Sequence, residues 1–258
     1  MKYALFGDLH GTELKDLENA LSTENPDCLI CTGDFDQVKT IRAYMQLKDR
    51  YEAEGKKVIT VPGNHDIAIL NNQDIESGTI MKQGKTSHVL HEELVNDPAT
   101  YTALKELVYS KHPKFTNHGI GIYLDQERFG KGFKTRIIHG AYDGNLSSYP
   151  DCPRGERELW ARLISSEDFI KNFFEMRQRG CNVMIRGHDH DAFYARDVCD
   201  EHPTGFISYN PWEETSGFRL LKHKTHVINH GALFRGSFAT IETRSSAEDC
   251  PILKYHEL

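Results

Sequence analysis

The chain has 258 residues, of which 38% are hydrophobic and 27% charged, the composition of a globular protein long enough to bury a substantial core. Its 31 basic and 38 acidic residues give a formal net charge of −7, which argues against binding to nucleic acid through overall charge. No apolar run approaches the roughly 18 residues that a membrane span needs, and the first residues lack the pattern of a signal peptide. We therefore expect a cytoplasmic protein without a membrane segment.

The first third of the chain alternates between strand and helix patterns. Short apolar runs at 2–6, 28–32 and 58–61 predict three strands. Between them, residues 12–24 and 38–54 carry apolar side chains at helical spacing. A β-α-β-α-β run of this kind implies a parallel sheet with right-handed crossovers.

The rest of the chain is less regular. Its middle predicts a loop with a short helix at 67–98, a helix at 99–111, a strand at 134–139, a loop at 141–155, a helix at 166–180 and a strand at 182–186. In the helix at 166–180 we expect Ser166 to be the N-cap and four residues to face the core: Phe169, Ile170, Phe173 and Phe174. Short strands follow at 192–198, 206–209, 218–221, 226–229 and 237–243. We expect one α/β domain over residues 1–258, a four-layer αββα sandwich of two mixed β-sheets flanked by helices.

Six cysteines are scattered along the chain, and two of them, Cys28 and Cys31, form a C-x-x-C pattern. A redox or zinc pair would need a turn there, but the intervening leucine and isoleucine indicate a buried strand, and there is no second C-x-x-C. We therefore expect reduced, buried thiols.

Carboxylate, imidazole and carboxamide side chains follow five of the predicted strands, and almost every one has a glycine beside it. The stretches are Gly7-Asp8-Leu9-His10-Gly11, Gly33-Asp34, Gly63-Asn64-His65-Asp66, His139-Gly140 and Gly187-His188-Asp189-His190. Ligands bind at the carboxyl ends of parallel strands, and glycine allows the close backbone approach that a crowded metal site needs. A chance Gly-Asn-His-Asp is expected roughly 0.004 times in a chain of this composition, so the ordered set is specific.

The same ordered motifs resemble the calcineurin-like metallophosphoesterase superfamily over almost the whole chain. The tail from His226 to Glu242 is similar to the closing strand pair of small bacterial and archaeal phosphodiesterases, except that His230 and Ala232 stand where proline and serine are usual. The resemblance implies that Asp8, His10 and His190 hold one metal ion. It further implies that Asn64, His139 and His188 hold a second metal ion, that Asp34 bridges the two, and that His65 faces the substrate.

The donor types agree with this assignment. Mixed carboxylate, imidazole and amide ligands suit Mn, Fe, Zn or Ni better than Ca or Mg, and we expect Mn first. A shared carboxylate such as Asp34 can hold two divalent ions about 3.5–4 Å apart, and a water shared by them would lose a proton and attack phosphorus. His65, next to Asn64, is placed to protonate the leaving alkoxide as the general acid.

One departure concerns the residue that orients His65. Many members of the family read GDxxD, with the last aspartate orienting the catalytic histidine, whereas Gln37 stands there in this chain and Asp36 comes one residue early. The arginine that follows in protein serine/threonine phosphatases is also missing. The sequence thus leaves open what holds His65, and it disfavours a protein phosphatase.

Several other polar residues have plainer interpretations. Asp66 and Asp189 are expected to be capping or supporting carboxylates rather than ligands. His226 and His230 are expected to be surface or strand residues. Three arginines could contact phosphate, although surface salt bridges are the simpler interpretation for each: Arg154, Arg157 and Arg235.

The sequence therefore predicts a dinuclear hydrolase of phosphomonoesters or phosphodiesters, with nucleotides among the candidates. Its partner would be a small phosphate ester and not nucleic acid or a membrane, and nothing in the sequence fixes the oligomeric state. Two alternatives use the same fold. A DNA nuclease like the nuclease subunit of the double-strand-break repair complex would want a capping domain and basic grooves, for which the chain is too short and too acidic. A non-catalytic scaffold like the retromer subunit would have lost ligands, whereas all seven ligand positions are filled here.

Overall fold

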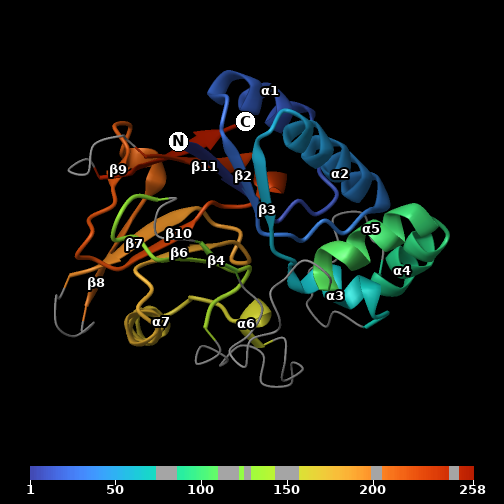
Figure 1. Ribbon diagram of the computed structural model, residues 1–258. Helices are drawn as coiled ribbons and strands as arrows, with labels where there is room; N and C mark the ends of the chain where they lie inside the picture. Colours follow the sequence, from blue (N-terminus) through green and yellow to red (C-terminus); the bar gives the residue numbers. More distant parts are fainter. Residues whose placement is uncertain (74–85, 110–121, 125–128, 143–156, 199–204, 244–249) are drawn as a thin grey trace.

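Two six-stranded β-sheets pack face to face, with helices on their outer faces (Figure 1). The computed structural model describes residues 1–73, 86–109, 122–124, 129–142, 157–198, 205–243 and 250–258. Within these residues the predicted four-layer αββα sandwich of two mixed sheets is confirmed.

The first sheet has the strand order β3-β2-β1-β11-β12-β9. Its strands are β1 (Lys2–Phe6), β2 (Cys28–Cys31), β3 (Lys57–Thr60), β9 (Phe218–Arg219), β11 (Ser237–Glu242) and β12 (Ile252–Glu257). β1, β2 and β3 are parallel, as the β-α-β-α-β pattern predicts, and β11 runs antiparallel beside β1. The sequence analysis missed β12, because only Leu253 among its residues is fully buried and its other positions are largely polar.

The second sheet has the order β4-β5-β6-β10-β7-β8. Its strands are β4 (Ile122–Leu124), β5 (Thr135–Ile137), β6 (Val183–Arg186), β7 (Phe193–Asp197), β8 (Phe206–Tyr209) and β10 (His226–Asn229). β5, β6 and β10 are parallel, so both sheets have a parallel centre with antiparallel strands added. Side chains from both sheets, such as Leu5 of β1 and Ile185 of β6, form the core between them.

The helices cover the two outer faces (Figure 1). α1 (Lys15–Glu24) and α2 (Val38–Ala53) pack their apolar sides on the first sheet, and α7 (Ser166–Gln178) packs on the second. The remaining elements are α3 (Asn64–Leu70), α4 (Ser87–Val95), α5 (Pro98–Tyr109), α6 (Arg157–Trp160), and the 3₁₀ turns η3 (Pro211–Glu213) and η4 (Leu233–Arg235). α3, α4 and α5 form a group next to α2.

Two details of α7 correct the sequence prediction. Ser165, not Ser166, is the N-cap: its hydroxyl accepts the Asp168 N–H, and the Asp168 carboxylate accepts the Ser165 N–H in return. Phe173 is buried, but Phe174 is 46% exposed, because consecutive helical residues point about 100° apart and only one of the pair faces the sheet.

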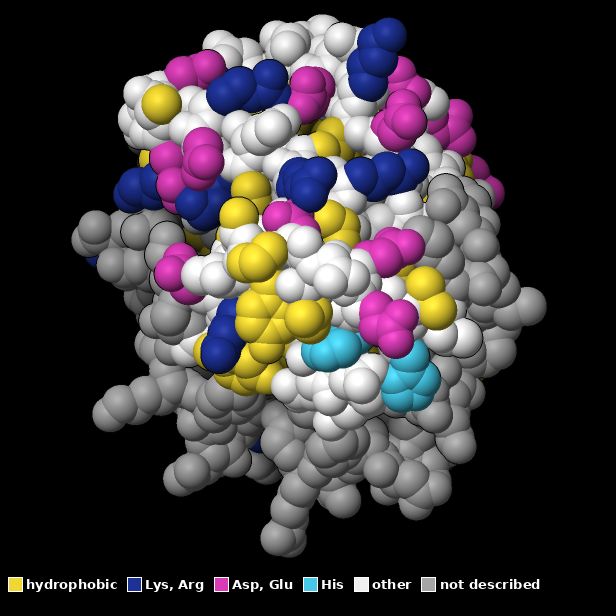
Figure 2. All heavy atoms as spheres, turned by 90° about the vertical axis from the view of Figure 1, so that its right-hand side faces the viewer, with side chains coloured by type: hydrophobic (Ala, Val, Ile, Leu, Met, Phe, Trp, Pro, Cys, Tyr) yellow, Lys and Arg dark blue, Asp and Glu magenta, His cyan; other side chains and the backbone are white. Residues whose placement is uncertain are grey.

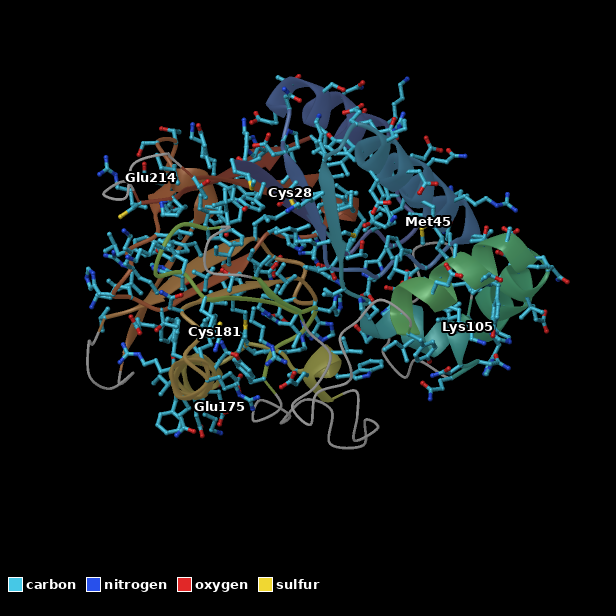
Figure 3. The ribbon with its side chains drawn as sticks, viewed as in Figure 1. Cys28, Met45, Lys105, Glu175, Cys181 and Glu214 are labelled. Atoms are coloured by element: carbon cyan, nitrogen blue, oxygen red, sulfur yellow. The ribbon has the colours of Figure 1, made fainter. Side chains whose placement is uncertain are left out.

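The described cysteines carry free thiols, with Cys28, Cys31 and Cys181 buried. Cys28 belongs to the first sheet and Cys181 lies beside the second, well apart in the fold (Figure 3). None of the helices in the described part of the chain combines the length and apolarity needed to cross a bilayer. On the face formed by α2 and α3–α5, basic and acidic side chains are intermingled (Figure 2).

Candidate metal centre

The predicted site residues lie just after five strands, and the structure brings these segments together where the two sheets meet. The loops after β1 and β2 carry Asp8, His10 and Asp34, and the loops after β5 and β6 carry His139, His188 and His190. Asn64 and His65 begin α3, shortly after β3. All five strands are parallel to a neighbour in their sheet, so their carboxyl ends share one edge. This arrangement gathers side chains that are far apart in the sequence.

Asp8, His10 and His190 form a first cluster of potential ligands. One nitrogen or oxygen atom from each lies within 4.8 Å of the others. The Nε2 atoms of His10 and His190 are 3.1 Å apart, and Nε2 of His190 is 3.6 Å from Oδ1 of Asp8. These are the three residues that the resemblance assigns to one metal ion.

Asp34, His139 and His188 form a second cluster with the same mutual spacing. Three buried atoms here have no hydrogen-bond partner among the described residues: Oδ1 of Asn64, Nε2 of His139 and Nε2 of His188. Buried polar atoms are paired in the great majority of cases, so three unpaired acceptors in one site call for a partner that accepts lone pairs. A divalent cation is such a partner.

Asp34 lies between the two clusters. Its Oδ2 atom is 3.2 Å from Nε2 of His139 and 3.8 Å from Nε2 of His10, one imidazole of each cluster. Its Oδ1 atom accepts the backbone N–H of His65 at 3.0 Å. The carboxylate is therefore held in the position that a bridging ligand would need.

The backbone at the site is unusual. Non-glycine residues with positive φ are uncommon, and Asp, Asn and His are the types most often found there. Six such residues lie in the site loops, with φ between 41° and 72°: Asp8, His10, Asp34, Asp36, His188 and His190. In this conformation the loops turn sharply after each strand, so that residues two apart can direct both side chains to one centre. Strain of this kind collects at functional sites.

Asp66 and Gly63 fix the position of Asp34. The Asp66 carboxylate accepts the backbone N–H groups of Gly63, Asp34 and Phe35 at 2.8–2.9 Å, which is the supporting role expected from the sequence. Gly63 is required by close approach, because a Cβ atom there would meet Oδ1 of Asp34 at 1.9 Å.

Asp36 holds His65, which answers the question that the sequence left open. Nδ1 of His65 lies 2.8 Å from Oδ1 of Asp36, and Nδ1 of His10 lies 2.7 Å from Oδ2 of the same carboxylate. Gln37 instead lies against Gly11, where an added Cβ would meet its Nε2 at 2.4 Å. Sequence reasoning noted Asp36 but gave it no role, because position 37 is the usual one.

Supporting contacts fix the other imidazoles. His139 Nδ1 donates to the carbonyl oxygen of Thr32 at 2.6 Å, which fixes the ring with Nε2 turned toward Asp34. The side-chain NH₂ of Asn229 donates to the Gly187 carbonyl oxygen at 3.1 Å, at the start of the loop that carries His188. A backbone carbonyl leaves no trace in the sequence, so the role of Thr32 could not be predicted.

Asp189 stabilises the loop after β6, which carries His188. Its carboxylate pairs with the fully buried guanidinium of Arg186 and accepts the Leu163 N–H at 3.2 Å. Burial alone would raise the pKa of Asp189, but the positive charge of Arg186 lowers it to about 2. Asp189 is thus the supporting carboxylate that the sequence predicted.

The pKa shifts of the site residues reflect the negative charge of the buried carboxylates. Burial raises the pKa of Asp8 to about 6, although neighbouring His139 lowers it. Burial would lower the pKa of His139 and His65, but the carboxylates of Asp34 and Asp36 raise them to about 9 and about 10 respectively. In the protein alone, protonated imidazoles therefore balance the buried carboxylates. Divalent cations would supply the same positive charge.

The residues present therefore fit two divalent cations. Each cluster offers one carboxylate and two imidazoles, and the carboxylate of the second, Asp34, also lies 3.8 Å from His10 of the first. Burial holds the pKa of His188 well below its usual range and lowers that of His190 to about 4, so both rings are neutral and ready to act as ligands.

Five other residues singled out in the sequence belong to neither cluster or lie outside the described residues. His226 lies in a strand, β10, within the expectation of a surface or strand position. That expectation is wrong for His230, which is fully buried outside any strand, with its Nε2 atom 2.8 Å from the hydroxyl oxygen of Thr32. Arg235 forms a salt bridge with Asp191, as the simpler interpretation predicted. Arg154 lies outside the described residues, as does the side chain of Arg157.

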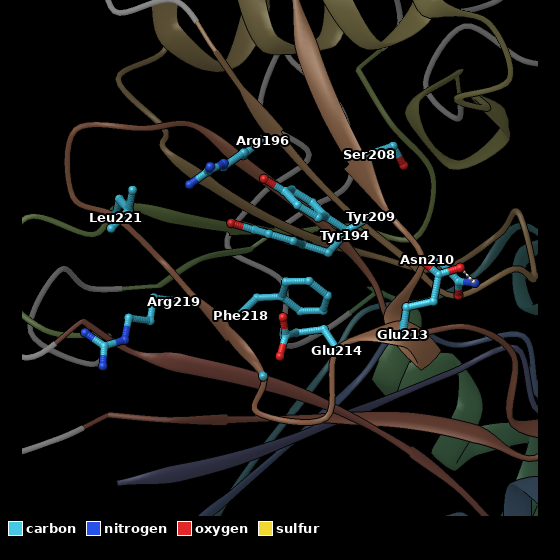
Figure 4. A pocket seen from close by; sticks show the side chains of 11 residues that line it. Tyr194, Arg196, Ser208, Tyr209, Asn210, Glu213, Glu214, Phe218, Arg219 and Leu221 are labelled. Atoms are coloured by element: carbon cyan, nitrogen blue, oxygen red, sulfur yellow. Dashed lines mark hydrogen bonds between the residues drawn. The ribbon is translucent and has the colours of Figure 1, made fainter.

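A separate pocket of about 610 Å³ lies between the edge strands β8 and β9 (Figure 4). In its wall, the rings of Tyr194 and Tyr209 stack with centroids 5.4 Å apart, and Phe218 lies 4.7 Å from Tyr194. None of the predicted site residues lines it. The pocket is therefore distinct from the candidate metal centre, and its stacked rings close the edge of the core between the sheets.

Comparison with known proteins identifies the family and the fold. A family model described as calcineurin-like phosphoesterase matches residues 1–192. A metallophosphoesterase structure from Sphaerobacter thermophilus is 18% identical with a TM-score of 0.62, and the match covers all of this chain and 88% of that one. A hypothetical protein from Pyrococcus horikoshii OT3 is 12% identical with a TM-score of 0.56, over all of this chain and 87% of that one. At these identities the structures show a shared fold. No curated protein matches the chain significantly.

Proposed function

The chain belongs to the calcineurin-like phosphoesterase family, and on that premise we propose that it hydrolyses small phosphomonoesters or phosphodiesters with two divalent cations. The proposed ligands are Asp8, His10 and His190 for one cation, Asn64, His139 and His188 for the other, and Asp34 as the bridge. His65 is the proposed general acid.

The position of the Asp34 carboxylate supports this proposal most directly. The same oxygen atom, Oδ2, lies near an imidazole of each cluster, at 3.2 Å from His139 and 3.8 Å from His10. A carboxylate needed only for folding would be expected to pair with one partner, for instance an arginine. A pair of cations requires two groups of ligands with one carboxylate between them, and the two histidine-containing clusters share the Asp34 carboxylate in this way.

Each residue near the site has a separate role in the proposed reaction. Cations bound here would activate a water molecule and polarise the phosphoryl oxygens. Asp66 and Gly63 keep Asp34 in place, and Thr32 keeps Nε2 of His139 directed inward. His65, held through Nδ1, presents its Nε2 atom as a proton donor to the leaving oxygen. The donor set suits Mn, Fe, Zn or Ni, of which we propose Mn.

Metal analysis combined with hydrolysis assays tests the proposal. Protein reconstituted with Mn, Fe, Zn or Ni should bind about two cations per chain and hydrolyse p-nitrophenyl phosphate, its bis-ester, or both. Comparing the two esters separates monoesterase from diesterase activity. A wider panel with cyclic nucleotides, dinucleoside polyphosphates and phosphoproteins would then narrow the substrate class. Inactivity with all four metals would favour the scaffold alternative instead.

A nuclease of the repair type remains the second enzymatic candidate, and nothing in the described residues favours it. On the described part of the face shown in Figure 2, basic and acidic side chains are intermingled and form no extended field of one sign. Incubation of the metal-loaded protein with linear duplex and single-stranded DNA provides the direct comparison. Cleavage at rates above those for small esters would reverse the order of the two proposals.

A further inference from the structure

The Asp36 carboxylate joins two imidazoles that serve different purposes. Its Oδ2 atom lies 2.7 Å from Nδ1 of His10, and its Oδ1 atom lies 2.8 Å from Nδ1 of His65. Asp36 is only 2% exposed, and its φ of 62° places the side chain between the two rings. The ring centroids of His10 and His65 are 4.8 Å apart. One buried carboxylate thus contacts both a proposed metal ligand and the proposed general acid.

The hydrogen-bond roles in this trio follow from chemistry. Each oxygen atom of the buried Asp36 carboxylate lies within hydrogen-bond distance of one imidazole Nδ1, and the two imidazoles supply the donors that a buried carboxylate needs. An ionised carboxylate can only accept, so both Nδ1 atoms must carry the proton. Nε2 of His10 is then the atom directed at the first cluster, 3.1 Å from Nε2 of His190. His65 likewise keeps Nε2 for the substrate side.

We propose that Asp36 is a positioning residue that couples cation binding in the first cluster to the orientation of the general acid His65. The second half of this inference rests on the proposed function. Besides holding His65, Asp36 contacts His10, a proposed ligand of the first cluster. Loss of Asp36 therefore affects two processes at once, and these processes can be measured separately.

Proton NMR of the metal-free protein tests the geometry without any activity. Two of the downfield Nδ1–H resonances are expected to belong to His10 and His65 and to exchange slowly with solvent, and His65→Gln should remove one of these two. Asp36→Ala should remove both. Asp36→Asn should remove at least one, because an amide presents one acceptor and one donor where two acceptors are needed. Persistence of both resonances in Asp36→Ala would overturn the proposal.

Calorimetric titration with Mn²⁺ tests the link to the first cluster. Asp36→Ala should weaken one of the two binding steps by about 10- to 100-fold, the usual effect of removing a group that orients a metal-binding histidine. His65→Gln lacks the acid but keeps Asp36 on His10, so both steps should stay within about twofold of the wild type. Asp97→Asn, which alters a surface ion pair with Arg42, is the matched control for removal of a carboxylate. Unchanged titrations of Asp36→Ala would contradict the coupling.

Kinetics at saturating metal isolate the effect on His65. Asp36→Ala should slow hydrolysis of an alkyl phosphate ester more than that of a p-nitrophenyl ester, because p-nitrophenolate leaves without a proton. The Asp36→Ala/His65→Gln double variant should be no slower than His65→Gln alone. Equal losses on both esters would refute the positioning of the acid.

If no protein hydrolyses any ester, the proposed function fails, and the NMR and calorimetric results still decide the role of Asp36. If Asp36→Ala does not fold, Asp36→Glu replaces it in these measurements, because it keeps the charge but moves the carboxylate.

Discussion

Oδ2 of Asp34, from the loop after a strand of the first sheet, lies 3.2 Å from Nε2 of His139, from the loop after a strand of the second sheet. Both residues are at most 1% exposed, so the pair closes the contact between the two sheets at the candidate metal centre. The contact places an acidic oxygen between two groups of histidines. Replacing either partner should therefore affect both proposed cation positions.

Asp34→Asn should bind fewer than two cations and lose turnover while the fold is retained. An amide oxygen keeps the size of the side chain but removes the charge shared between the clusters, so we expect kcat/KM to fall by about 100-fold or more. Metal content by elemental analysis and hydrolysis of p-nitrophenyl esters are the measurements, with circular dichroism to check the fold. Full activity in this variant would refute the bridging role.

Gly63→Ala should abolish cation binding through steric conflict alone. The added Cβ would lie 1.9 Å from Oδ1 of Asp34, so the aspartate must move. Gly55→Ala is the control: its Cβ meets nothing within 4 Å, and at a φ of 75° it should cost only about 1 kcal/mol of stability. Metal binding should be lost in the first variant and unchanged in the second. Equal metal content in the two would show that the Asp34 position is not critical.

His65→Gln should lower kcat by about 10²- to 10⁴-fold for alkyl esters and by much less for p-nitrophenyl esters. A good leaving group departs without protonation, so the acid matters only for poor ones. Steady-state rates for a matched pair of esters check this prediction, with metal content measured on the same samples. An identical loss for both esters would point to a role in substrate contact rather than in proton transfer.

His226 should make stability depend on pH below neutrality. Its Nε2–H donates to the Leu221 carbonyl at 2.9 Å, its Nδ1 accepts from the Tyr194 hydroxyl at 2.8 Å, and burial lowers its pKa to about 4. The unfolded chain takes up a proton near the ordinary histidine pKa of about 6.5, whereas the folded chain does so only near 4. Stability from this group is therefore complete above pH 6.5 and is lost as pH falls toward 4, at up to about 1.4 kcal/mol per pH unit.

Urea unfolding of metal-free protein at pH 7, 6 and 5 measures this loss. His226→Gln should be less stable at pH 7 but should show a smaller decline between pH 6.5 and 5, by about 2 kcal/mol. His230, whose pKa burial lowers to about 3, contributes a further decline that both proteins share. Parallel stability curves for wild type and His226→Gln would mean that the imidazole is not held neutral in the folded protein.

Much of the site could be predicted from local sequence. Five of the proposed ligands follow an apolar strand beside a glycine: Asp8, His10, Asp34, His188 and His190. The carboxyl ends of parallel strands share an edge, so such residues are expected to lie together. The same rule grouped residues from β1 and β6 although about 180 positions separate them. The pattern could not distinguish a loop from a short helix after β3, where Asn64 and His65 begin α3, because seven residues are too few for a clear period.

Hydrophobic runs and glycine turns are local features, so the parallel strands and the types of side chain at their ends could be inferred from the amino-acid order. The contacts of Asp36 with both His10 and His65, and the contact of the Thr32 carbonyl oxygen with His139, became evident only in the folded protein. Those contacts depend on left-handed backbone at Asp36 and on how the two sheets face each other. Such relationships arise from three-dimensional packing over long sequence separations, which no local pattern encodes.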